Sequence, residues 1–167
     1  MYEIGDYVVK PVNGVCKIAD ILHLDMTGTD KNKLYYLLIP LEDKSGKIYV
    51  PVDKADSGIR KIMTKEAALE FISRIPEMKE IWVDNEKLRE QRYKEAVKSC
   101  KPEALIGLIK ITYLRNKEKV AQGKKTTVVD ERYFKLAENN LYAELGCALH
   151  KDKSEVYQLI VDSINRC

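Results

Sequence analysis

The chain has 167 residues, 33% charged and 45% hydrophobic, which is enough for one ordinary domain or two small ones and too short for a large multidomain enzyme. Its 29 Lys and Arg against 26 Asp and Glu give a net charge of +3, and no apolar run approaches the roughly 18 residues of a membrane span. The first residues lack the pattern of a secretory signal, so we expect a cytoplasmic protein without a membrane anchor. The four cysteines form no Cys-x-x-Cys pair, so neither a zinc site nor a disulfide framework is indicated.

Short β-rich runs separated by turns fill the first sixty residues. Residues 7–9 are followed by a turn over residues 11–14, where Asn13-Gly14 tolerates a positive φ, and by a run over residues 15–21. Further runs cover residues 34–39 and 48–51. Four or five such strands predict a small, strongly bent SH3- or Tudor-like β-barrel over residues 1–58.

The last of these strands ends at Pro51, which cannot donate a ladder hydrogen bond, so we expect this strand at an edge. An open edge could pair with a strand of another protein by β-augmentation. An edge covered by the following domain is the alternative.

Beyond Arg60 the hydrophobic period changes from two to about 3.6 residues, which indicates helices. Helices are predicted over residues 64–75, about 84–98, 102–121, and from 127 and 154 onward. Asp84 is the expected cap of the second helix, and Thr127 with Asp130 forms a capping arrangement for the fourth. Residues 59–167 should therefore form an all-α domain of about five helices, which makes the chain α+β in two domains.

The positive charge is concentrated in one central block. Residues 87–125 hold twelve Lys and Arg against four acids, a net +8, whereas residues 1–60, 61–86 and 126–167 are each mildly acidic. Such a block is an electrostatic footprint for a polyanion such as the DNA backbone. A set of solvated helix faces explains the charge alone equally well.

Three bases of the predicted 84–98 helix, Lys87, Lys94 and Lys98, fall within one narrow angular sector and form a basic stripe. Arg89 and Arg92 lie on another side, where they flank a buried seam or reach a second ligand surface.

Other basic residues join this surface if the neighbouring helices pack side by side; these are Lys124, Lys125 and Arg132.

Trp82, the one tryptophan, precedes the basic helix and is either a core anchor or a wedge against bases.

Convergent catalytic groups are not evident in the sequence. The two histidines, His23 and His150, stand alone, and no phosphate loop, nucleophile elbow or metal-ligand spacing is present. We therefore expect a binding protein with no catalytic residues, no metal and no cofactor.

Several short motifs, by their order and spacing, resemble the CarD/CdnL family of bacterial transcription regulators. They are Gly5-Asp6-Tyr7-Val8-Val9 with Pro11 and Gly14-Val15, Tyr35-Tyr36, Tyr49-Val50-Pro51-Val52, Gly58-Ile59-Arg60 and Arg92-Tyr93-Lys94. The similarity covers essentially the whole chain. Its first part is similar to the polymerase-interacting domain also found in transcription-repair coupling factors.

This resemblance implies that the N-terminal domain binds the β-subunit lobe of RNA polymerase. The helical domain would contact promoter DNA upstream of the −10 element, mostly through its backbone, and change the stability of the open complex. The implied polymerase-binding positions are Leu24, Ile48, Tyr49, Val50 and Pro51. The implied DNA-binding positions are Arg89, Arg92, Lys94 and Arg132, to which the charge pattern adds Lys87, Lys98, Lys124 and Lys125.

One departure from the family and one alternative function stay open. Family members carry a minor-groove tryptophan a few residues before Arg-Tyr-Lys, but Arg89 occupies that register here and Trp82 lies a turn or two earlier. The alternative is an adaptor that docks on polymerase without touching DNA. The sequence leaves open activation or repression; we expect a monomer, with a strand-exchanged dimer as the other possibility.

Overall fold

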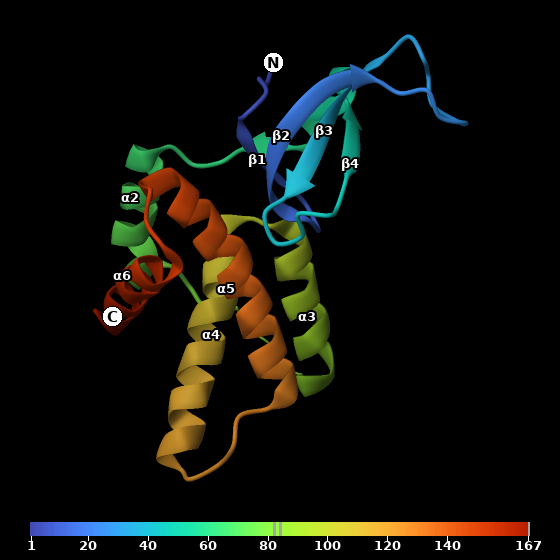
Figure 1. The fold of residues 1–167 in the computed structure, drawn as a ribbon. Helices are drawn as coiled ribbons and strands as arrows, with labels where there is room; N and C mark the ends of the chain where they lie inside the picture. Colours follow the sequence, from blue (N-terminus) through green and yellow to red (C-terminus); the bar gives the residue numbers. More distant parts are fainter. Residues whose placement is uncertain (82, 84, 167) are drawn as a thin grey trace. The chain divides into compact units, whose positions relative to one another are not determined.

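The computed structural model describes residues 1–81, 83 and 85–166. The chain divides into two compact units, Met1–Ile62 and Met63–Cys167 (Figure 1). The expected domain boundary after residue 58 lies four residues earlier than this division. The reason is that β5 (Arg60–Lys61) pairs with β1 and so belongs to the N-terminal unit.

The N-terminal unit is built on a five-stranded antiparallel sheet with the strand order β4-β3-β2-β1-β5. Its other strands are β1 (Tyr7–Lys10), β2 (Gly14–His23), β3 (Leu34–Pro40) and β4 (Ile48–Pro51). A short 3₁₀ turn η1 (Val52–Lys54) and a one-turn helix α1 (Ala55–Gly58) lead from β4 to β5.

The expected barrel is not closed. β4 and β5 are the two ends of the sheet, and no hydrogen-bonded ladder joins them within residues 1–62. Two features of the chain account for this: β5 is only two residues long, and η1 and α1 follow β4 directly. A register shift between Ile18 and Asp20 bends β2, as β-bulges do.

The core of this unit follows the two-residue period of the strands. It contains Val8, Cys16, Ile18, Tyr36, Leu38, Val50, Ala55 and Ile59. The Tyr36 hydroxyl accepts a hydrogen bond from the backbone N–H of Tyr2 at 3.0 Å, which ties the N-terminal segment to the sheet.

The β1–β2 turn differs from the expectation for Asn13-Gly14. The positive φ values fall on Val12, at 75°, and Gly14, at 76°, and not on Asn13. Asn13 donates its backbone N–H to the Lys10 carbonyl at 3.1 Å, so Pro11 and Val12 are the central residues of the turn. A β-branched residue is strained in this left-handed region.

The C-terminal unit is helical, with α2 (Lys65–Arg74), η2 (Ile75–Glu77), α3 (Glu86–Ser99), α4 (Pro102–Ala121), α5 (Val128–Leu149) and α6 (Lys153–Asn165). Side chains cap two of these helices: Thr127 accepts from the Asp130 N–H, as the sequence suggested, and Thr64 accepts from the Ala67 N–H at the start of α2. The expected cap Asp84 lies outside the described residues, and Asn85 is the N-cap of α3. Asp152 forms a capping box for α6.

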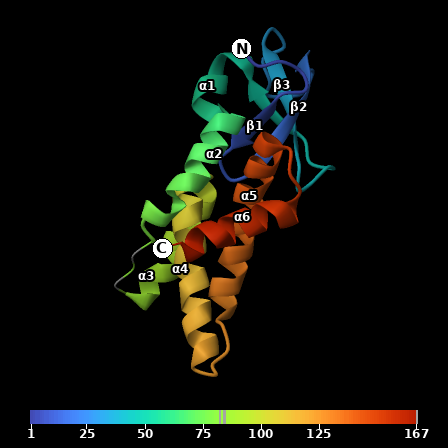
Figure 2. The same cartoon turned by 90° about the vertical axis from the view of Figure 1, so that its left-hand side faces the viewer.

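Helix α4 is the centre of this unit. Its residues 105–110 are all buried, so the helix is covered on every side in its first half. Figures 1 and 2 show α5 alongside α4, with the connecting loop over residues 122–127 at one end of the pair. In the part of the chain that the structure describes, every helix is too short or too polar to span a lipid bilayer.

Two buried polar side chains hold non-helical segments of this unit. Lys110 of α4 is fully buried and donates its Nζ to the carbonyls of Ile75 and Met78, at 3.0 and 2.5 Å. Buried Glu144 of α5 accepts the backbone N–H of Met63 at 3.0 Å. The bonds of Lys110 fix the end of α2 and the start of the segment that leads to α3.

Candidate functional site

Strand β4 lies at an edge of the sheet, as Pro51 suggested. It pairs with β3 on one side, and no strand pairs with its other side within residues 1–62. Val50 points into the core and is 6% exposed, whereas Ile48, Tyr49 and Pro51 are partly exposed. The backbone of β4 and the partly exposed side chains therefore form the available surface.

Leu24 does not contribute to such a surface. It is 7% exposed, at the end of β2, and its carbonyl accepts a hydrogen bond from the Thr29 hydroxyl at 3.3 Å. The structure thus places four of the five implied polymerase-binding positions together on β4 and the fifth inside the unit.

Helix α3 carries the basic stripe that the sequence suggested. Lys87, Lys94 and Lys98 are all exposed, and Arg92 is exposed on another side of the same helix. Arg92 makes a long ion pair with Glu95, with Nη1 3.9 Å from Oε2. From Lys87 to Lys98 the helix rises about 16 Å, which corresponds to several phosphates of a DNA strand.

Arg89 is placed differently from these four residues. Its side chain is only 12% exposed and lies against Glu86, with Nε–Oε2 and Nη2–Oε1 distances of 3.1 and 3.0 Å. Its third contact is a hydrogen bond from Nη1 to the Tyr93 hydroxyl at 3.4 Å. Arg89 therefore belongs to the seam between α3 and its neighbours, the first of the two roles considered for it.

Arg132 of α5 is also engaged. Its Nη2 donates to Glu90 of α3, and its guanidinium lies over the Tyr133 ring, 4.7 Å from the centroid. The Tyr133 hydroxyl donates to the same Glu90 oxygen at 3.2 Å. Arg132 remains 55% exposed, so it links α3 to α5 while one side of it still faces solvent.

Lys124 and Lys125 lie in the loop between α4 and α5, and both are exposed. Gly123, at φ 71°, ends α4, and the backbone N–H groups of Gly123 and Lys124 bond to Val120 and Lys119. This is a Schellman arrangement, which fixes the direction in which the loop leaves the helix.

A second ion pair, not anticipated from the sequence, lies between α4 and α5. Arg115 Nε donates to Asp130 Oδ2 at 2.9 Å, and Arg115 Nη1 lies 3.6 Å from Glu86 Oε1. Asp130 is fully buried, and its other oxygen, Oδ1, has no hydrogen-bond partner. Opposite charges on both sides of a short interhelical loop are the signal that could have suggested this pair.

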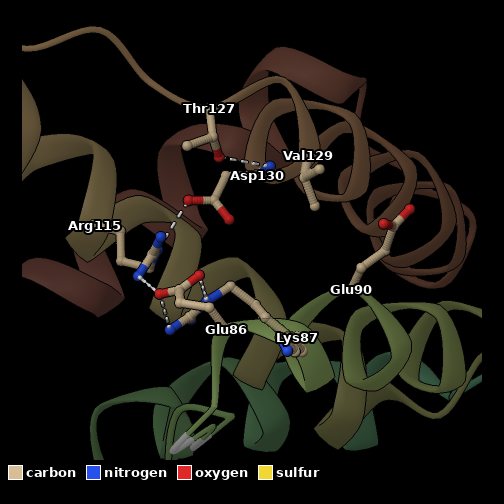
Figure 3. Close-up of a pocket in the computed structure, with 8 residues that line it drawn as sticks. Glu86, Lys87, Glu90, Arg115, Thr127, Val129 and Asp130 are labelled. Atoms are coloured by element: carbon tan, nitrogen blue, oxygen red, sulfur yellow. Dashed lines mark hydrogen bonds and ion pairs between the residues drawn. The ribbon is translucent and has the colours of Figure 1, made fainter.

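These residues line a recess of about 300 Å³ between α3, α4 and α5 (Figure 3). Its lining is formed by Glu86, Lys87, Arg89, Glu90, Arg115, Thr127, Val129 and Asp130. Figure 3 shows one Asp130 oxygen directed at Arg115 and the other directed into the recess.

Electrostatics at the recess follow from these contacts. Hydrogen bonds from Arg89 hold the pKa of Glu86 below its ordinary value, so this carboxylate is ionised at neutral pH. Burial raises the pKa of Tyr93, and the negative charge of Asp130 adds to the rise while the bond from Arg89 opposes it. The lining holds three acids, Glu86, Glu90 and Asp130, against two arginines, and Lys87 at the rim brings the formal charges of the recess into balance.

Trp82, the other residue considered as a wedge, lies outside the described residues. The geometry offers two surfaces for a partner: the open edge of β4 in one unit, and the basic face of α3 in the other.

Comparison with known families bears on the first surface. Residues 2–63 match the model of the CarD-like/TRCF RID domain. The N-terminal unit is a CarD-like/TRCF RID domain. RID denotes an RNA polymerase-interacting domain, so RNA polymerase is the partner supported for this unit.

The match confirms the resemblance for the RID domain and ends at the beginning of the helical unit. A comparison with curated proteins gives no match to the chain. The RID domain therefore carries the family assignment, and β4 is one of the two edge strands of that domain.

Proposed function

We propose that the chain is a non-catalytic transcription regulator that binds the β-subunit lobe of RNA polymerase through its RID domain and contacts promoter DNA through its helical unit. The observation that carries the first half is the RID match, combined with an edge strand whose outer side is unpaired within residues 1–62. An unpaired edge accepts a partner strand through its main-chain hydrogen bonds. Such a protein would act in the bacterial cytoplasm, where this polymerase works.

Binding to the isolated β lobe tests the edge. Tyr49→Lys places a charge on β4, and Tyr7→Lys places the same charge on β1, which lies between β2 and β5 in the sheet. We expect Tyr49→Lys to weaken binding at least about tenfold and Tyr7→Lys to leave it unchanged. Equal affinities of the two folded variants and the wild type would remove the edge from the proposal.

The second half of the proposal rests on the +8 block and on its exposed members along α3. Lys87, Arg92, Lys94 and Lys98 face solvent on one helix, and cations so placed bind phosphates without reading sequence. Contact just upstream of the −10 element would then stabilise or destabilise the open complex.

Titration of duplex promoter DNA at several salt concentrations tests this part. Arg92→Ala with Lys94→Ala should weaken binding and lower the slope of log affinity against log salt by about two. The matched control removes an exposed Lys and Arg from α2, with Lys65→Ala and Arg74→Ala. If both double variants keep the slope of the wild type, the α3 surface does not contact DNA.

A polymerase adaptor without DNA contact is the second candidate. It is favoured by the fact that Arg89, Arg115 and Arg132 already pair with acids of their own unit. A photo-crosslinker attached at Lys94→Cys, in a complex with polymerase and forked promoter DNA, separates the two functions. Crosslinks to DNA support the regulator, and crosslinks confined to protein support the adaptor.

A further inference from the structure

The carboxylate of Glu86 lies between two arginines at the mouth of the recess. Arg89 approaches it with Nε and Nη2 at 3.1 and 3.0 Å, and Arg115 Nη1 lies 3.6 Å from Oε1. Glu86 itself is 73% exposed, whereas the side chains of Arg89 and Arg115 are only 12% and 22% exposed. The two cations are thus largely buried parts of the fold, and the anion between them is an exposed surface residue.

Both guanidinium groups are held from behind by buried partners. Arg115 bonds through Nε to Asp130, and Arg89 bonds through Nη1 to Tyr93. Arg89 Nε and Nη2 and Arg115 Nη1 face Glu86. If Glu86 turned into solvent, these N–H groups would keep their positions and present a preformed oxyanion site.

We infer that Arg89 and Arg115 form a site for a phosphate group of the DNA backbone, which Glu86 closes in the free protein. The inference rests on the proposed DNA contact, and it adds Arg115 to the contact surface and gives Glu86 an inhibitory role. A phosphodiester presents two oxygens that share one negative charge, as a carboxylate does, so it accepts the same N–H groups.

The site lies at the mouth of the recess and not in its interior. The unpartnered Asp130 oxygen is directed into the recess and repels an anion that goes deeper. Lys87 stands at the rim, among the lining residues, and the same phosphate or its neighbour reaches it from the solvent side.

Displacement of Glu86 costs little because ion pairs with a solvent-exposed partner contribute little to stability. Arginine N–H groups bind phosphate bidentately, and each phosphate contact also releases a counterion from DNA. The closed form therefore prevails without DNA, and a correctly placed duplex opens it.

Glu86→Gln tests the inference, with Glu103→Gln as its matched control. Both acids are exposed in the first turn of a helix, so both changes add the same charge near a helix N-terminus. Glu103 lies twelve residues before Arg115 on α4, about 18 Å along the helix. Duplex DNA affinity is measured at several salt concentrations by fluorescence anisotropy, after circular dichroism has verified the fold.

We expect Glu86→Gln to raise affinity roughly fivefold above Glu103→Gln near 0.1 M salt and to increase the salt slope by about one. Adding Arg115→Gln, or Arg89→Gln as a second variant, to Glu86→Gln should abolish this gain. Equal DNA affinity and equal salt slope for Glu86→Gln and Glu103→Gln would overturn the inference. The proposed function would still stand in that case if the double variant Arg92→Ala with Lys94→Ala weakens DNA binding.

A second arm distinguishes the source of the phosphate. Inorganic phosphate is titrated onto the Glu86→Gln protein at constant ionic strength, and binding is followed by calorimetry. Phosphate binding without any gain in DNA affinity assigns the site to a free phosphate and overturns its assignment to DNA. Absence of DNA binding by the wild type and by Glu86→Gln at low salt rejects both the inference and the DNA half of the proposed function.

Discussion

The Arg115–Asp130 pair should contribute asymmetrically to the stability of the helical unit. Arg115→Met leaves the Asp130 carboxylate fully buried, with Oδ1 already unpartnered and Oδ2 deprived of its donor at 2.9 Å. Removal of one partner from a buried pair costs about 3–5 kcal/mol. Because Arg115 is 22% exposed and water reaches the vacated space, we expect about 2–4 kcal/mol here.

Asp130→Asn changes the other partner of the ion pair. It keeps an acceptor for Arg115, whose charge reaches solvent, so we expect a loss of only about 1 kcal/mol. The double variant Arg115→Met with Asp130→Leu removes both charges and should recover most of the loss of Arg115→Met.

Urea unfolding followed by far-UV circular dichroism measures these differences, because the long helices all belong to the C-terminal unit. We expect the loss in free energy of unfolding to be largest for Arg115→Met and smaller for Asp130→Asn, with the double variant nearest the wild type. Equal small losses for the two single variants would refute the reasoning, because they would mean that solvent reaches the Asp130 carboxylate.

Three further changes have expected outcomes. Val12→Gly should stabilise the N-terminal unit by about 1 kcal/mol, and Val12→Ala by less, in thermal unfolding, because φ is 75° there. Lys110→Met should destabilise the helical unit by about 2–3 kcal/mol in urea, since the Ile75 and Met78 carbonyls lose their donor. Burial raises the pKa of Glu138, so the folded state favours its protonated form. The stability that this group contributes is present below its pKa in the unfolded chain and is lost as the pH rises through its pKa in the folded chain. Glu138→Gln should therefore raise the urea midpoint at neutral pH and leave it nearly unchanged at about pH 4; an equal rise at both pH values would contradict this.

Local physics made much of the fold predictable from the sequence. The hydrophobic period over residues 64–75 and the cap Thr127 predicted helices that begin within a residue or two of those observed. Pro51 predicted the edge position of β4, because a residue without an N–H cannot serve an interior ladder. These signals act over a few residues, so they can be interpreted without knowledge of tertiary contacts.

The geometry of the β1–β2 turn and the closure of the sheet were harder to predict from the sequence. The pair Asn13-Gly14 suggested where φ is positive, yet Pro11 at the preceding corner shifts one positive φ to Val12. Closure of the barrel depended on the length of β5, only two residues, and on η1 and α1 after β4. Both outcomes depend on how several segments fit together and not on the preference of any one of them.

For the candidate site, the sequence by itself determined that the positive charge is concentrated between residues 87 and 125, and that Lys87, Lys94 and Lys98 share a helix face. Only the tertiary structure decided which cations are available. Lys110 is buried against backbone carbonyls, and Arg89 and Arg115 form ion pairs with Glu86. Helical periodicity fixes the direction of a side chain, but Lys110 and Arg115 find their partners on other segments of the chain. The α4–α5 pairing that brings Asp130 to Arg115 is a property of the packed core.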